Sequence, residues 1–140
     1  MRVLVDTSAW VDFLNGYPSA VATALAELLA GEEDLCTCGI VVAEVFQGLR
    51  TNKPREALRR SFEELTFLEP SGIRLYLRAA EVYRMLRQRG RTVRSTIDCV
   101  VAITAEEHGC YVLALDRDME AILGSGLVKA RPWPVAGPPP

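Results

Sequence analysis

Four acidic side chains stand beside apolar stretches of this 140-residue chain, where carboxylates are rarely placed. Asp6 and Asp116 each end a short apolar run, Asp98 precedes one, and Glu44 interrupts another. The runs span residues 2–5, 111–115, 99–103 and 40–46, respectively. A carboxylate in such a setting pairs with a cation, caps a helix or binds a metal. Because three of the four have no Lys or Arg close by in sequence, the pattern favours a divalent cation and a metal-dependent hydrolase.

The chemistry of such a hydrolase calls for several acids in one place. Mg²⁺ prefers oxygen ligands and keeps some of its waters, so a few carboxylates and a substrate phosphate suffice to hold it. One or two metal ions would then activate a water and stabilise both oxygens of an in-line displacement at phosphorus. Nucleophilic catalysis is disfavoured, because the single histidine, His108, lacks a convincing set of Ser or Cys partners.

Two of the acids also have a structural interpretation as helix caps. Asp6 precedes a helical pattern, but Thr7 and Ser8 offer alternative caps, so an acid is not needed there and function is favoured. Ser95 and Asp98 have the spacing of a capping box ahead of an apolar run. A capping acid and a metal ligand at a helix N-terminus are compatible, so both roles stay open for Asp98.

The remaining acids are distinguished by their neighbours. Glu44 lies in the middle of a helical pattern, close to Gly48, which indicates a helix face open to a cleft. Asp116 and Asp118 both fit a turn. We expect Asp118 to cap the short helix that follows and Asp116 to be the ligand.

The elements that must position these acids alternate between strands and helices, which predicts an α/β fold with a central parallel sheet and helices on both faces. Ligands bind such sheets beyond the carboxyl ends of the strands, where Asp6 and Asp116 are placed. Pro54 fits the first turn of a helix, and Ser71 is predicted to cap another. The predicted strands are residues 1–6, 35–38, 66–69, 110–115 and 127–130, and the predicted helices are residues 7–14, 19–30, 40–50, 54–65, 71–90, 95–108 and 118–123.

Length and composition predict one domain over residues 1–131, followed by a flexible proline-rich tail at 132–140. No apolar stretch is long enough to span a bilayer and no signal peptide is recognisable, so we expect a cytoplasmic protein without a membrane partner. A chain of this size does not need disulfides, and its four cysteines lack the usual spacing of a zinc site. Buried, inert thiols are favoured over a zinc site made by Cys36, Cys38, Cys110 and His108.

The net charge of −2 conceals an asymmetry along the chain. Residues 50–94 carry twelve basic side chains and five acidic ones, whereas the rest of the chain is acidic. A basic segment beside an acidic cluster suits a polyanion whose scissile phosphate meets metal ions. For any single arginine, a solvent-exposed helix face is the simpler explanation.

Taken together, these motifs resemble those of the PIN-domain ribonucleases and, among them, the VapC toxins of VapBC toxin–antitoxin pairs. The resemblance covers residues 1–124. Ala114 and Leu115 depart from the polar or hydroxyl side chain that many relatives carry before the last aspartates, and Met119 replaces a common phenylalanine. The motifs are residues 5–11, 43–49, 92–102 and 112–119.

The resemblance implies a Rossmann-like three-layer sandwich and a metal-dependent endoribonuclease acting on tRNA or other structured RNA. It implies a homodimer that is neutralised by a cognate VapB-like antitoxin. It also implies Mg²⁺ or Mn²⁺ held by Asp6, Glu44, Asp98 and Asp116, with Asp118, Ser8, Arg94 and Ser95 as supporting residues.

Three other functions compete with this one. A phosphotransfer enzyme with Asp6 as nucleophile would want a second acid two positions later, where Ser8 stands. A receiver-type signalling domain would want paired acids near the first strand and a lysine after a late strand, where Arg117 lies between two aspartates. A catalytically inactive PIN domain that only binds partners is disfavoured by the complete set of four acids.

Overall fold

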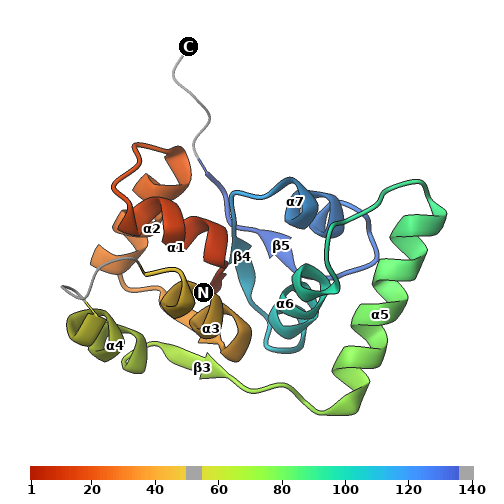
Figure 1. Ribbon diagram of the computed structural model, residues 1–140, viewed down its shortest axis with the longest axis horizontal. Helices are drawn as coiled ribbons and strands as arrows, with labels where there is room; N and C mark the ends of the chain where they lie inside the picture. Colours follow the sequence, from red (N-terminus) through yellow and green to blue (C-terminus); the bar gives the residue numbers. More distant parts are fainter. Residues whose placement is uncertain (50–54, 136–140) are drawn as a thin grey trace.

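The computed structural model describes residues 1–49 and 55–135 and contains a five-stranded sheet in the order β3-β2-β1-β4-β5 (Figure 1). Every neighbouring pair of strands is parallel. This confirms the predicted parallel sheet. The strands are β1 (Arg2–Val5), β2 (Asp34–Cys38), β3 (Thr66–Leu68), β4 (Tyr111–Leu113) and β5 (Arg131–Pro132).

Helices cover both faces of the sheet. In Figure 1, α1 to α4 gather on one side of the strands and α5 to α7 on the other, which is the three-layer arrangement predicted from the sequence. The pairs α1 and α2, α5 and α6, and α6 and α7 pack closely against each other. The helices are α1 (Thr7–Leu14), α2 (Ala20–Ala30), α3 (Gly39–Gln47), α4 (Arg55–Glu63), α5 (Ile73–Gln88), α6 (Thr96–Glu107) and α7 (Arg117–Leu123).

The central strand β1 positions the candidate site. Val3, Leu4 and Val5 are completely buried, as expected for a strand covered by helices on both faces. β1 pairs with β2 on one side and with β4 on the other, with Val5 opposite Leu113. The chain order reverses around β1, so Asp6 leaves the sheet at a topological switch point, where open α/β sheets bind ligands.

The last strand differs from the prediction. β5 comprises residues 131–132 instead of 127–130, although Val128 and Ala130 are buried. The Lys129 N–H donates to the carboxylate of Glu106 over 2.8 Å, so it is not available to a strand ladder. Val128 and Ala130 alternate with exposed residues because their side chains are buried, and this alternation predicted a strand. Their backbone does not pair with a neighbouring strand.

The boundary placed at residue 131 falls inside this strand. Pro132 pairs with Val112 at the edge of the sheet, a position that tolerates a missing N–H. The Trp133 N–H donates to the Val112 carbonyl over 2.8 Å, and its ring packs edge-on against Tyr111 with centroids 5.4 Å apart. The predicted tail therefore contributes to the sheet at its beginning. Residues 136–140 lie outside the described residues.

Two helix starts also need comment. The predicted cap Ser71 is wrong, because α5 begins after Gly72, whose φ of 121° separates Ser71 from the first turn. The Ser71 hydroxyl donates to Glu107 instead. α3 ends at Gln47, and the predicted place of Pro54 in the first turn of α4 lies outside the described residues.

The four cysteines are free and buried, as expected. Among the helices of the described ranges, none combines the length and the apolar character needed to cross a membrane.

Candidate metal centre at the carboxyl edge of the sheet

Asp6 ends β1 and caps α1. Its Oδ2 accepts hydrogen bonds from the Ser8 hydroxyl, over 2.8 Å, and from the Ser8 N–H. Asp6 is only 4% exposed, and this burial raises the pKa of its carboxyl, although the bonds from Ser8 partly offset the effect. Asp6 thus fills the cap position that Thr7 and Ser8 could have taken, while the charge of Asp116 acts on the same carboxylate.

Asp98 lies in the first turn of α6. Ser95 caps this helix, as predicted, but its hydroxyl accepts from the Ile97 N–H over 3.0 Å and not from the Asp98 N–H that a capping box would use. The reciprocal bond of such a box, from a backbone N–H to the Asp98 carboxylate, is absent among the described residues. Burial and then the charges of Asp116 and Asp6 raise the pKa of Asp98 to about 7. Its carboxylate therefore faces other acids across a partly enclosed space.

Asp116 and Asp118 follow β4 along the chain. Asp116, and not Asp118, caps α7: its Oδ1 accepts from the Asp118 N–H over 3.1 Å, so the predicted assignment of the cap is wrong. The chain turns into the helix one residue earlier than expected, because β4 ends at Leu113 and α7 begins at Arg117. Capping by Asp116 leaves it beside Asp98.

Three of these acids form the closest cluster. Asp98, Asp116 and Asp118 each offer one oxygen within 4.8 Å of the others, and all three are partly buried. Carboxylates at this separation repel one another unless a cation is present. The cluster joins α6 to the carboxyl end of β4.

Arg94 is the basic side chain that contacts this cluster. Its Nε and its backbone N–H donate to Asp118 Oδ2 over 2.9 and 3.0 Å, and its Nη2 donates to Asp116 Oδ1 over 3.1 Å. The hydrogen bonds from Arg94 lower the pKa of Asp118. Asp118 and Arg94, which were predicted to support the site, thus lie beside the candidate ligands Asp98 and Asp116.

Glu44 approaches the site from α3. Its Oε1 accepts from the Thr7 hydroxyl over 2.8 Å, and Thr7 directly follows Asp6. Glu44 is half-buried but does not belong to the cluster of three acids. This contact between Thr7 and Glu44 was not predicted, and the place of Thr7 next to Asp6 was the only sign of it in the sequence.

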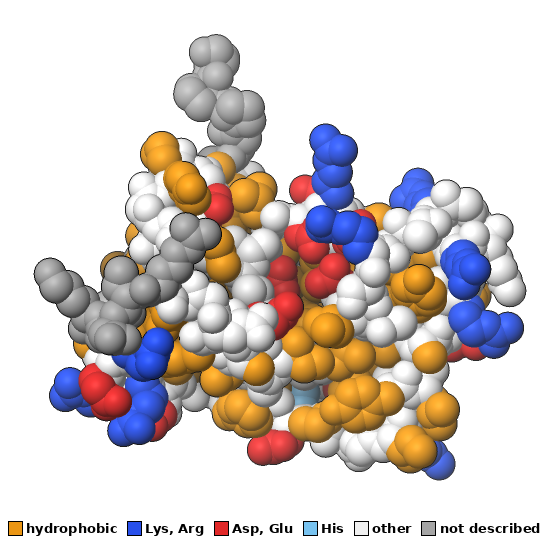
Figure 2. Space-filling model, in the orientation of Figure 1, with side chains coloured by type: hydrophobic (Ala, Val, Ile, Leu, Met, Phe, Trp, Pro, Cys, Tyr) orange, Lys and Arg blue, Asp and Glu red, His pale blue; other side chains and the backbone are white. Residues whose placement is uncertain are grey.

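Ser8 connects the two strands that carry the site. Its hydroxyl donates to Asp6 and accepts from the Leu115 N–H over 2.9 Å. Leu115 thereby contacts Ser8 through its backbone N–H. The space-filling view shows acidic side chains gathered in a hollow at the middle of one face, with basic side chains beside them (Figure 2).

The donor set fits a hard divalent cation. All candidate ligands are carboxylate oxygens, which suit Mg²⁺ or Mn²⁺, and no sulfur or imidazole lies in the cluster. Burial is the largest cause of the raised pKa of Asp98, and the charges of Asp116 and Asp6 add to it; a bound cation would offset this repulsion between the acids.

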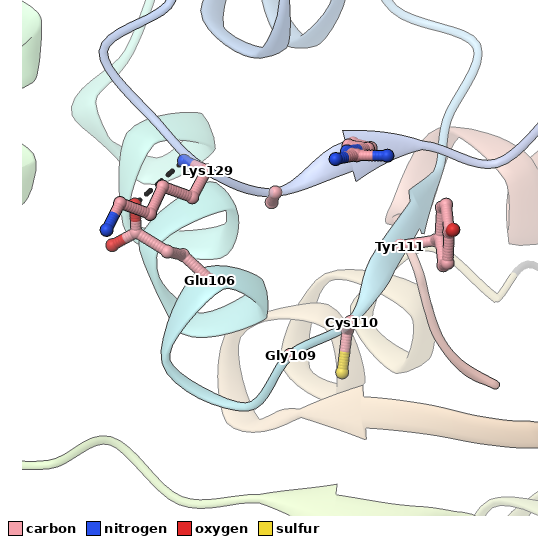
Figure 3. A pocket seen from close by; sticks show the side chains of 7 residues that line it. Glu106, Gly109, Cys110, Tyr111 and Lys129 are labelled. Carbon is pink, nitrogen blue, oxygen red and sulfur yellow. Dashed lines mark hydrogen bonds between the residues drawn. The ribbon is translucent and has the colours of Figure 1, made fainter.

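A second hollow lies away from these acids, around the first residues of β4 (Figure 3). Its volume is about 250 Å³. The single acid in its lining, Glu106, is already bonded to Arg78 and to the Lys129 N–H. This hollow offers no cluster of ligands.

Comparison with known proteins identifies the family. The PIN domain family model matches residues 3–123. Over 121 residues the chain is 31% identical to VapC ribonuclease Mb1587 of Mycobacterium bovis and to ribonuclease VapC11 of Mycobacterium tuberculosis, covering 86% of this chain and 90% of each relative. The chain therefore belongs to the PIN domain family. These relatives confirm the predicted resemblance to PIN-domain ribonucleases of the VapC type.

Solved structures share the fold at lower identity. VapBC-1 from nontypeable Haemophilus influenzae matches with a TM-score of 0.68 and 18% identity, over 95% of this chain and 98% of that one. Mycobacterium tuberculosis VapC20, a toxin that cleaves the sarcin–ricin loop, matches with a TM-score of 0.59 and 23% identity, over 93% and 99%. These matches confirm the predicted PIN-like fold.

Proposed function

We propose that this protein is a VapC-type toxin, an endoribonuclease that hydrolyses structured RNA with the help of Mg²⁺ or Mn²⁺. The observation that carries the proposal is the cluster of Asp98, Asp116 and Asp118 within 4.8 Å, beside the buried Asp6 at the centre of the sheet. The VapC ribonucleases that share 31% of its sequence support the same activity.

In this proposal Asp6, Asp98 and Asp116 hold the cation, and Glu44 completes the ligand set from α3. When bound, Mg²⁺ or Mn²⁺ supplies Lewis-acid polarisation of the phosphate and makes a water a better nucleophile at neutral pH. Ser8 orients Asp6 through its 2.8 Å hydrogen bond, and Thr7 orients Glu44 in the same way. Asp98 must lose its proton to act as a ligand, so its raised pKa links metal affinity to pH.

The test is cleavage of a structured RNA by the purified protein with Mn²⁺ or Mg²⁺, with chelator, and with the variants Asp6→Asn and Asp98→Asn. Both variants keep side-chain shape and remove charge, so we expect activity to fall at least about 100-fold while the fold is retained. Asp12→Asn, in α1 but outside the cluster, is the matched control and should cleave normally. Cleavage that survives chelator and Asp98→Asn would show that these acids are not the active site.

We also propose two protein partners, a VapB-like antitoxin and a second copy of the chain. The VapBC structures that share its fold are toxin–antitoxin assemblies, which supports the first. Exposed apolar side chains support association: Ile73 is 73% exposed, Leu77 62% and Tyr76 49%. Hydrophobic side chains are also exposed along the lower part of the face seen in Figure 2.

Two measurements test these partners. Expression of the chain alone should arrest growth, and co-expression with its cognate VapB-like antitoxin should relieve the arrest. Light scattering of the purified chain should give twice the monomer mass of 15.4 kDa. Undisturbed growth would contradict the toxin function, and a monomer at all concentrations would contradict the dimer.

A further inference from the structure

The loop that leads into α6 carries Arg94, a positively charged side chain that is hydrogen-bonded to the acidic cluster. Arg94 makes two hydrogen bonds to one oxygen of Asp118, one from its backbone and one from Nε, and a single bond from Nη2 to Asp116. The two acids are thus held unequally: Asp118 by two donors and Asp116 by one. Arg94 is firmly attached to Asp118 and weakly attached to Asp116.

The weaker contact lies on a residue that the proposed metal site needs. Asp116 belongs to the cluster whose oxygens lie within 4.8 Å of one another, and its negative charge contributes to the raised pKa of Asp98. A guanidinium and a divalent cation repel each other, so both cannot bind Asp116 without loss of affinity. Asp118 does not present this conflict if it remains with Arg94.

The side chain is also free to move. Arg94 is 81% exposed, whereas Asp116 and Asp118 are each 14% exposed. No packed stem must be displaced when Nη2 leaves Asp116, and the backbone bond to Asp118 does not depend on the position of the guanidinium. Release of Asp116 alone is therefore the least costly rearrangement.

We propose that Arg94 is a built-in counter-cation of this site, which neutralises Asp116 in the metal-free protein, releases it when the metal binds, and stays bonded to Asp118. This inference rests on the proposed metal site. It gives Asp118 the role of an anchor for Arg94 and makes Arg94 a positioning residue that lowers the affinity for the metal while stabilising the metal-free state.

The experiment is a calorimetric titration of the full-length protein with Mn²⁺ at low ionic strength and without RNA. Arg94→Ala and Arg94→Gln should each bind Mn²⁺ about two- to fivefold more tightly, the range for one solvent-exposed charge pair, and should melt at a lower temperature in chelator. Arg94→Lys keeps the charge without the two-pronged geometry and should lie between them and the wild type. The difference should shrink as salt screens the charges.

Arg84→Ala is the matched control, because Arg84 is an exposed arginine of α5 bonded to Glu81. It should leave Mn²⁺ affinity unchanged. If folded Arg94→Gln binds Mn²⁺ no more tightly than the wild type does, the proposed role of Arg94 is wrong. The proposed metal site would not be affected by that result. A wild-type protein that takes up no Mn²⁺ would overturn the metal site and the exchange at Arg94 together.

Discussion

The Ser8 hydroxyl lies 2.8 Å from Asp6 Oδ2 and, through its second bond to the Leu115 N–H, ties the end of β1 to the end of β4. One small side chain thus adds a second link to the Asp6 N–H bond to the Leu113 carbonyl, which already joins these strand ends. The hydrogen bond from the Ser8 hydroxyl opposes the effect of burial on the pKa of Asp6.

Ser8→Ala should therefore lower both stability and metal affinity. Leu115 N–H loses its acceptor and Asp6 loses a donor, so we expect the free energy of unfolding to fall by about 1 kcal/mol. The pKa of Asp6 should rise, which weakens Mn²⁺ binding near neutral pH. Denaturant melts and Mn²⁺ titration measure the two effects. The same change at the exposed Ser61 of α4 is the control, and equal results at both positions would contradict the role of Ser8.

Asp98→Asn should stabilise the metal-free protein, and more at high pH than at low pH. The folded-state pKa of about 7 lies above the ordinary value of 3.8, so the folded protein retains a proton that the unfolded chain has lost. The carboxylate therefore destabilises the fold increasingly as pH rises through this interval, and fully above pH 7. Asn carries no charge at any pH.

The gain from Asp98→Asn should be larger at about pH 8 than at about pH 5 by on the order of 1 kcal/mol, after allowance for solvent screening. Thermal melts in chelator at both pH values, with Asp12→Asn beside them, measure it. A gain that does not depend on pH would mean that Asp98 is not crowded by the other acids.

Charge reversal of Arg87, Arg89 and Arg91 should weaken RNA binding. These residues are exposed at the end of α5 and in the loop toward Arg94. Each lost phosphate contact should reduce the slope of log affinity against log salt by about 1. Filter binding between about 50 and 200 mM salt measures the slope.

The control for that experiment reverses Arg55, Arg59 and Arg60 on α4, which changes the total charge equally. If both triple variants weaken RNA binding equally, Arg87, Arg89 and Arg91 have no specific role in RNA binding and are ordinary solvent-exposed arginines.

Removal of residues 132–140 should destabilise the sheet. It deletes Pro132 from β5, the Trp133 N–H bond to Val112 and the packing of Trp133 on Tyr111. We expect a loss of about 2–4 kcal/mol, as for removal of a large, partly buried aromatic ring. Chemical denaturation against a chain ending at residue 135 measures it. Equal stability of the two truncated proteins would restore the original boundary at residue 131.

The sequence allowed the strands at the centre of the sheet to be predicted, because β1 and β4 are short apolar runs, each followed by an acid. The prediction of the last strand was wrong, because there the buried residues are not the residues that pair with a neighbouring strand. Val128 and Ala130 are buried without belonging to a strand, and Arg131 and Pro132 pair although both are exposed. Alternation of apolar residues reports burial, and only the three-dimensional arrangement decides whether the backbone is paired.

The candidate acids were chosen from the sequence, and their cation partners were judged by sequence proximity, so Arg94 entered only through the family resemblance. Arg117 is the neighbour of Asp116 along the chain, yet the side chain that contacts Asp116 is Arg94, 22 residues away. Likewise, Thr7 reaches Glu44 across 37 residues. Contacts of this kind depend on how α3, α6 and α7 meet at the edge of the sheet, which no local pattern encodes.

The pairing of β1 with β4 joins residues from opposite ends of the chain, with Val3 opposite Tyr111. During synthesis, Asp6 and Glu44 are made long before Asp98, Asp116 and Asp118. The acidic cluster cannot assemble until β4 has been made and inserted beside β1. An unfinished chain on the ribosome therefore lacks the acidic cluster, which forms only when the residues that follow β4 have been made.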